Sequence, residues 1–137
     1  MESNYKITTR DYRDSDYLDV VTWWESWKFT PLLKEILPDT GAITLVDGVP
    51  MFAAWLYLTN SCIHCITWFV RRKVYMPRKV RDKGVIVTFN YLEKLSKDMQ
   101  GKVIFTMTAN KTLRNILPLT GYELVETNSS EFIKTLR

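Results

Sequence analysis

The basic residues of this chain are concentrated in one segment whose chemistry suits phosphate. Residues 71–83 contain seven of the 19 lysine and arginine residues and only one of the 15 acidic residues. The rest of the chain holds 12 basic and 14 acidic residues, so the excess positive charge belongs to this segment. Arginine can bind two phosphate oxygens through parallel hydrogen bonds. We therefore expect an anionic partner at residues 71–83.

The end of the basic segment coincides with the expected start of a helix over residues 84–100. Apolar residues recur at helical spacing from Val85 to Met99, and Gly101 ends the pattern. The first N–H groups of a helix have no partner within the helix and attract anions. The sequence favours a phosphate cradle made by Lys79, Arg81 and the backbone of residue 84, a glycine that allows close approach. A solvated loop leading into the helix is the alternative.

Cys62 and Cys65 flank the only histidine of the chain, His64. A structural zinc site usually needs four protein ligands, and this cluster offers at most three, so we expect no metal. The cysteines lie in a strand-like run, where positions three apart point to opposite faces, which disfavours a redox pair. We predict two reduced thiols and a cytoplasmic location. No apolar run reaches the roughly 20 residues that span a bilayer, so we expect no membrane contact.

The elements that must position these residues alternate along the chain. The turn Asp47-Gly48 indicates a hairpin within a three-stranded antiparallel meander over residues 41–70. We predict further strands at 5–12, 102–108, 122–127 and 131–136, and helices at 15–27, 31–37, 84–100 and 110–121. The strand that ends before residue 78 should run parallel to the strand at 102–108, because a helix joins them. The prediction is one α/β (α+β) domain over residues 1–137, with a mixed, twisted sheet of six to seven strands and about four helices.

This order of elements resembles the GCN5-related N-acetyltransferase (GNAT) superfamily. The stretch "RDKGVI" resembles the pyrophosphate loop of that superfamily, Q/R-x-x-G-x-G/A, with Arg81 and Gly84 at matching positions and Ile86 in place of the final small residue. The resemblance implies that the backbone of residues 82–86 wraps the pyrophosphate of acetyl-CoA. The bulk of Ile86 departs from the pattern at a point of close approach.

A second stretch, "NKTLRNILPLTGY", resembles the later superfamily motif N-x-x-A-x-x-L-Y-x-x-x-G-F. The resemblance implies that Asn110 helps hold the pantetheine arm. Leu117 stands where many members carry a tyrosine that protonates the departing thiolate, and leucine cannot act as an acid. An enzyme of this sequence would use water or another hydroxyl, such as that of Tyr75 or Tyr122.

The expected site residues follow from these two motifs and from candidate bases. His64 and Glu25 are both candidates for the base that deprotonates an amine acceptor, and the sequence does not decide between them. Trp23 falls off the apolar stripe of Leu18, Val21 and Trp24, so we expect it to be exposed. The expected cofactor-binding residues are Val74, Tyr75, Lys79, Arg81, Asp82, Lys83, Gly84, Val85, Ile86 and Asn110.

Two hypotheses of function follow. The first is a CoA-dependent N-acyltransferase that moves the acetyl group of acetyl-CoA to an amine. The second is a catalytically lapsed module of the same fold that binds a protein, or nucleic acid through Arg71, Arg72 and Lys73. The small domain resembles stand-alone copies common in bacteriophages, which would place it in the host cytoplasm. The sequence does not identify the acceptor or the oligomeric state.

Overall fold

A single mixed sheet runs through the molecule, with its strands in chain order. The computed structural model describes residues 4–108, 110–128 and 130–136. Neighbouring strands are antiparallel except for the last pair, which is parallel. The predicted meander with its turn at residues 47 and 48 is therefore confirmed, as is the parallel pair. The strands are β1 (Ile7–Asp11), β2 (Gly41–Val46), β3 (Val49–Tyr57), β4 (Ile63–Arg71) and β5 (Val103–Phe105).

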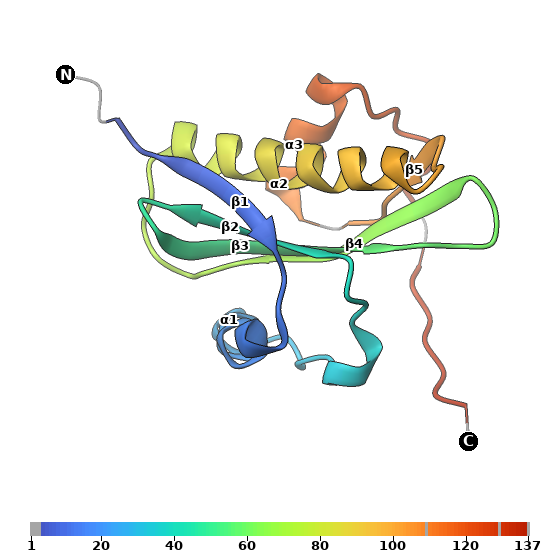
Figure 1. The fold of residues 1–137 in the computed structure, drawn as a ribbon, viewed down its shortest axis with the longest axis horizontal. Helices are drawn as coiled ribbons and strands as arrows, with labels where there is room; N and C mark the ends of the chain where they lie inside the picture. The colour runs from blue at the N-terminus through green and yellow to red at the C-terminus, as the bar shows by residue number, and fades with distance from the viewer. Residues whose placement is uncertain (1–3, 109, 129, 137) are drawn as a thin grey trace.

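Helices cover the two faces of the sheet unequally. Along one face lies the long helix α2 (Arg78–Asp98), with α3 (Lys111–Ile116) on the same side (Figure 1). The other face carries α1 (Tyr17–Ser26), which leaves the end of the sheet at β5 uncovered (Figure 1). Three short 3-10 helices complete the connections: η1 (Asp14–Asp16), η2 (Lys34–Ile36) and η3 (Leu117–Thr120).

Small residues let α2 lie close against the sheet. Its buried face includes Gly84, Thr88 and Ser96 beside larger apolar residues such as Phe89. A Cβ atom on Gly84 would stand 2.2 Å from Cε2 of Phe52, closer than real atoms approach. The glycine expected to approach a phosphate is therefore a packing residue inside the helix.

The opposite core is built from aromatic residues of α1 and the sheet. Trp24 stacks on Trp55 with ring centroids 5.6 Å apart, and Tyr12 meets Trp55 edge to face. Trp23 is 3% exposed, whereas Leu18 is 76% exposed, so the prediction of an exposed Trp23 is wrong. The stripe that faces the sheet passes through Val20, Trp23 and Trp24, one residue out of phase with the stripe expected from the apolar pattern.

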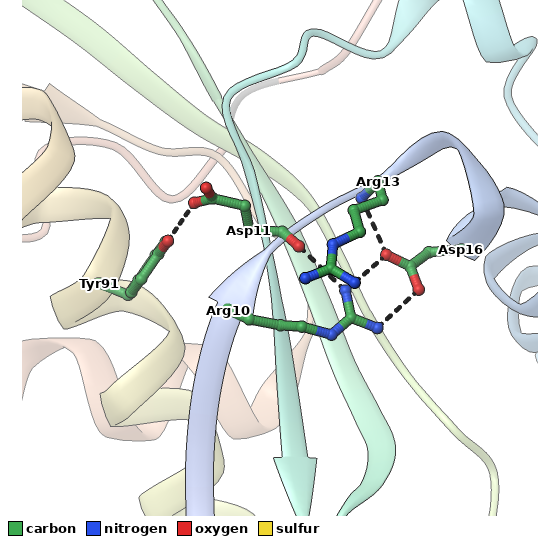
Figure 2. Close-up of polar contacts among 5 residues, drawn as sticks. All are labelled: Arg10, Asp11, Arg13, Asp16 and Tyr91. Atoms are coloured by element: carbon green, nitrogen blue, oxygen red, sulfur yellow. Dashed lines mark hydrogen bonds and ion pairs between the residues drawn. The ribbon is translucent and has the colours of Figure 1, made fainter.

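Polar contacts fix the entry into α1 and tie α2 to β1 (Figure 2). Arg10 donates two hydrogen bonds of 2.8 Å to the two carboxylate oxygens of Asp16, which also accepts the backbone N–H of Arg13. Burial alone would raise the pKa of Asp16, but these hydrogen bonds outweigh it and lower that pKa. The hydroxyl of Tyr91 on α2 donates to the carboxylate of Asp11.

Four expected elements differ from the structure. α2 begins at Arg78, six residues before the predicted start, because Pro77 occupies the N-cap and the first turn is basic instead of apolar. The predicted helix at 31–37 is reduced to η2. The predicted strands at 122–127 and 131–136 do not form in the described part of the chain, so the sheet has five strands instead of six or seven and three α-helices instead of about four. Within the same residues, no helix is long and apolar enough to cross a membrane.

Candidate functional site

A groove opens where β4 ends and α2 begins. It consists of two adjoining cavities of about 440 and 200 Å³ that share Arg78 and Arg81, and we call it the basic groove. Arg71, Val74, Tyr75 and Met76 line the larger part, and Asp82, Lys111, Thr112, Asn115 and Ile116 line the smaller. The groove is thus formed by the chain that leaves β4, the first turn of α2 and one side of α3.

The charges of the basic groove are poorly balanced within the protein. Four cationic side chains line it, and Asp82 is the one acid in the two linings. Asp82 lies 3.6 Å from Nε of Arg81 and 3.8 Å from Nε of Arg78, too far for hydrogen bonds. Nε of Arg81 is buried and has no hydrogen-bond partner in the described part of the chain. Burial and the nearby charge of Arg81 both lower the pKa of Arg71, which indicates a local excess of positive potential.

The first turn of α2 adds backbone donors to this potential. The N–H of Arg81 donates to the carbonyl of Pro77 at 3.0 Å, so the N–H groups of residues 78–80 precede the first intrahelical bond. Such groups attract anions, and the helix dipole strengthens the attraction. The helix end with free N–H groups therefore lies at residues 77–80, ahead of the predicted start. The backbone of residues 84–86 is inside the helix, where its N–H groups bond to the preceding turn.

The edge of β4 leads from the middle of the sheet to the basic groove. β5 pairs only with Ile63–Cys65, and within the described residues no strand pairs with the rest of β4 on that side. A bulge interrupts β4 at Trp68, whose φ is +61°, and turns its backbone out of the regular ladder. The indole N–H of Trp68 donates to the hydroxyl of Tyr57 at 2.9 Å, so the ring is held on the bulge.

The first three cations of the basic segment each lie over a tryptophan ring. The guanidinium of Arg71 lies 4.7 Å from the ring centroid of Trp27, and that of Arg72 lies 5.4 Å from the centroid of Trp23. The ammonium of Lys73 lies 5.0 Å from the Trp27 centroid. These distances are typical of cation–π contacts. The structure does not support the nucleic-acid hypothesis, because the three residues assigned to it contact Trp23 of α1 or Trp27 at its C-terminal end.

The expected cofactor residues divide into two groups. Val74, Tyr75, Arg81 and Asp82 line the basic groove. Lys79 and Lys83 are exposed and lie outside both linings, and Asn110 caps α3 by accepting the N–H of Leu113. Gly84 is buried in α2, and the side chains of Val85 and Ile86 pack in or against the core. Arg71, Arg78, Lys111, Thr112 and Asn115 line the groove but were not expected as cofactor residues. Pro77, as a helix-start signal, could have moved the expectation to Arg78.

The expected catalytic residues are not brought together. His64 is buried, and its Nδ1 lies 2.7 Å from Oγ of Ser96 near the end of α2, roughly 27 Å along the helix from Arg78. The hydroxyl of Tyr122 donates to Glu93 at 2.6 Å, and burial together with this carboxylate raises the pKa of Tyr122. Glu25 is exposed on α1.

The hydroxyl that could replace the missing tyrosine lies in the groove itself. Leu117 is buried in the core beneath α2, so no acid is expected from that position. Tyr75 is 91% exposed and lines the larger cavity.

Comparisons with known proteins find similarity in structure alone. No protein-family model matches the chain, and no curated protein sequence matches it. N-acetylglutamate synthase from Neisseria gonorrhoeae, solved with coenzyme A and N-acetyl-glutamate, superposes with a TM-score of 0.67 at 10% identity, over 92% of this chain and 30% of the synthase. This chain therefore spans less than a third of that enzyme.

Two shorter proteins match over most of their own length. An acetyltransferase from Trypanosoma brucei matches with a TM-score of 0.63 at 13% identity, over 93% of this chain and all of that protein. A Mycobacterium tuberculosis protein solved in complex with CoA matches with a TM-score of 0.64 at 14% identity, over 90% of this chain and 76% of that protein. At these identities the likeness establishes the fold, which is that of GNAT acetyltransferases.

Proposed function

We propose that this chain is a CoA-dependent N-acyltransferase, which transfers the acetyl group of acetyl-CoA to an amine. The observation that carries the proposal is the basic groove, in which four cationic side chains stand against one carboxylate, that of Asp82. Nε of Arg81 is buried there without a hydrogen-bond partner in the described part of the chain, and a buried donor of this kind is unfavourable unless a ligand accepts its hydrogen bond. Two proteins of similar fold were solved with CoA bound, which supports CoA as that ligand.

The residues of the groove fit a pyrophosphate-containing ligand. Arg78 and Arg81 stand between the two cavities, where each side chain reaches either one. The N–H groups of residues 78–80 add donors at the same place. Lys111 lies across the smaller cavity and adds a further positive charge. The protein thus contributes at least three cationic side chains and one helix terminus to hold phosphate groups.

In the proposal, the free edge of β4 positions the arm of the ligand. Within the described residues, no strand pairs with the backbone from Ile66 to Val70 on the β5 side, and this edge leads from the groove to the bulge at Trp68. A bound acetyl-CoA would supply a thioester there. Tyr75 is the hydroxyl best placed for proton donation, because Leu117 is buried and Tyr122 is bonded to Glu93.

His64 has no chemical role in this proposed function. Its imidazole contacts Ser96 near the C-terminal end of α2, far from the basic groove. A His64→Gln variant that folds should therefore keep its CoA affinity. No residue of this chain is assigned as the base that deprotonates the amine. A cytoplasmic location, in a bacteriophage host if the chain is viral, remains a prediction of the sequence resemblance.

The test is a calorimetric titration with CoA of the full chain and of two charge-reversal variants on the same helix. Arg81→Glu should weaken CoA binding on the order of a hundredfold, because it removes charge-assisted hydrogen bonds and adds repulsion. Lys83→Glu is the matched control, since Lys83 is exposed on α2 outside the groove, and its effect should be less than about threefold.

Catalysis is then followed by release of the CoA thiol from acetyl-CoA in the presence of arylamines, polyamines or lysine peptides. Tyr75→Phe should lower the rate and leave CoA affinity nearly unchanged. Absence of CoA binding at millimolar ligand would overturn the proposal. An equal loss of affinity in both charge-reversal variants would move the binding site out of the groove.

A further inference from the structure

The two cavities of the basic groove differ in size and position. The larger cavity, beside the end of β4, has a volume of about 440 Å³, which is within the range of ligand pockets. The smaller cavity lies between α2 and α3, and its volume of about 200 Å³ is below that range. The smaller cavity therefore has room for one compact group of a ligand and not for the whole molecule.

The side chains that line the smaller cavity are of the types that bind phosphate. Arg78 and Arg81 line it from α2, and Lys111 lines it from α3. The hydroxyl of Thr112 and the side-chain amide of Asn115 also line it from α3, and both can donate hydrogen bonds to an anion. Positive charge and neutral donors thus come from two helices that face each other across the cavity.

The charge of the smaller cavity is not balanced within the protein. Its lining holds three cationic side chains against one carboxylate, that of Asp82. Asp82 lies within 4 Å of both arginines, whereas Lys111 has no ion-pair partner in the described part of the chain. The cavity therefore favours a group that carries more than one negative charge.

CoA contains two kinds of phosphate, and only one of them fits this description. Its pyrophosphate joins the nucleotide to the arm that ends in the thiol, and its ribose carries a separate phosphate monoester on the 3′ oxygen. A phosphate monoester has close to two negative charges at neutral pH. In the proposed function the arm follows the edge of β4, so the pyrophosphate lies in the larger cavity, which Arg71 and Val74 line at the end of that strand. The 3′-phosphate is then the anionic group left for the smaller cavity.

We propose that the smaller cavity binds the 3′-phosphate of CoA and that Lys111 sets the preference for CoA over dephospho-CoA, the same molecule without that phosphate. The inference rests on the proposed function, because it takes the larger cavity as the pyrophosphate site. Arg78 and Arg81 line both cavities and contact both groups, whereas Lys111 is the cation that lines the smaller cavity alone. Its ammonium is a compact charge with three rotatable donors, which suits a phosphate monoester.

Calorimetric titration of the full chain with CoA and with dephospho-CoA tests the inference. The wild type should bind CoA on the order of thirtyfold more tightly, because charge-assisted hydrogen bonds to the 3′-phosphate are lost in dephospho-CoA. Lys111→Gln should weaken CoA binding about tenfold and leave the affinity for dephospho-CoA within about twofold of the wild type. The preference for CoA should therefore shrink to about threefold in this variant.

Two further variants control for general charge and for the pyrophosphate. Arg114→Gln removes an exposed cation of the same helix that lies outside both linings. At about 150 mM salt, where charges more than about 8 Å apart are largely screened, it should leave both affinities within about twofold. Arg81→Glu should weaken the binding of both ligands, because Arg81 lines both cavities. Lys111 is exposed, so its variant should keep the melting temperature of the wild type to within a few degrees.

The outcomes separate this inference from the proposed function. Equal affinity of the wild type for CoA and dephospho-CoA would overturn the inference and leave the proposed function standing. A Lys111→Gln variant that weakens both ligands equally would place Lys111 at the pyrophosphate and also overturn it. Failure of the wild type to bind either ligand at millimolar concentration would overturn the proposed function, and the inference with it.

Discussion

Two groups of cations from one basic segment have different surroundings in this molecule. Arg72 lies over the ring of Trp23 in α1, and Lys73 lies over Trp27, the residue that follows this helix. Arg78 and Arg81 lie five to nine residues further on and line a groove with a single carboxylate. Both groups look alike in the sequence, where only their charge is visible. In the fold their partners differ: Arg72 and Lys73 contact tryptophans and stabilise α1, whereas Arg78 and Arg81 are available to a ligand.

Arg71 belongs to both surroundings and shows how they meet. Its guanidinium lies over Trp27, its carbonyl accepts the indole N–H of that residue at 2.8 Å, and its side chain also lines the basic groove. The aromatic cluster therefore fixes one wall of the groove. This difference between cations held by the fold and cations in the groove can be tested by four variants, beginning with the largest expected effect.

Removal of the aromatic partner of Arg72 should lower the stability of the fold. Trp23→Ala should lower the free energy of unfolding by about 4 kcal/mol, because a buried indole and its contact with Arg72 are lost. Urea denaturation measures the loss, with Leu18→Ala on the same helix as a control that should change it by less than about 0.5 kcal/mol. A loss below about 1 kcal/mol would mean that Trp23 is not in the core.

A methyl group added at Gly84 should act on the core and not on the groove. Overpacking against Phe52 costs up to about 3 kcal/mol, and the better helix propensity of alanine returns about 1 kcal/mol, so Gly84→Ala should destabilise the fold by about 2 kcal/mol. The CoA affinity of the folded variant should stay within about threefold of the wild type. A tenfold weaker affinity with unchanged stability would restore the interpretation of residues 82–86 as a phosphate loop.

A cation with a carboxylate partner should contribute stability that depends on pH. Asp16→Asn should destabilise the protein by about 1.5 kcal/mol at neutral pH through loss of the charged contact with Arg10. The pKa of Asp16 is lowered in the folded state, so this contribution is complete above the unfolded value of about 4 and is lost as the pH falls through the folded value. The difference between wild type and variant should therefore shrink below about pH 4. A difference that is constant between pH 3 and 7 would assign the effect to packing.

Loss of the charges over the tryptophans should have the smallest effect. Arg72→Gln combined with Lys73→Gln should lower the free energy of unfolding by about 1 kcal/mol and CoA affinity by less than about threefold. Calorimetry and urea denaturation measure the two quantities on the same samples. If this pair weakens CoA binding as strongly as Arg81→Glu does, the two groups of cations are one binding surface and the comparison fails.

The sequence predicted most of the central sheet, because its signals there are local. The turn at residues 47 and 48, with φ of +51° and +81°, and the long apolar strands on each side fix the hairpin. A helix between β4 and β5 fixes their parallel pairing. These features depend on neighbouring residues and on chain connectivity, and both are visible before the fold is known.

The start of α2 and the exposure of Trp23 were not obtained in the same way. The first turn of α2 is basic, and Val80 is the one buried apolar residue ahead of Gly84, so a search for apolar periodicity places the start of the helix too late. Trp23 is buried because α1 packs on the sheet through Val20, Trp23 and Trp24, and this packing cannot be read from the sequence of the helix alone. The predicted phosphate loop at residues 82–86 depended on the predicted helix start at residue 84, so the late start also misplaced the loop. Lys111 and Asn115 come from α3, which only the fold brings to the groove.

The bulge in β4 also gives the protein an optical reporter. Three of the five tryptophans are fully buried and a fourth, Trp27, is half-buried, whereas Trp68 stands on the bulge with 37% of its surface exposed. Its ring has an apolar body and a polar N–H, so its emission responds to changes in its contact with water. A change in tryptophan fluorescence that is lost in a Trp68→Phe variant would report, without a label, that a molecule binds along the edge of β4.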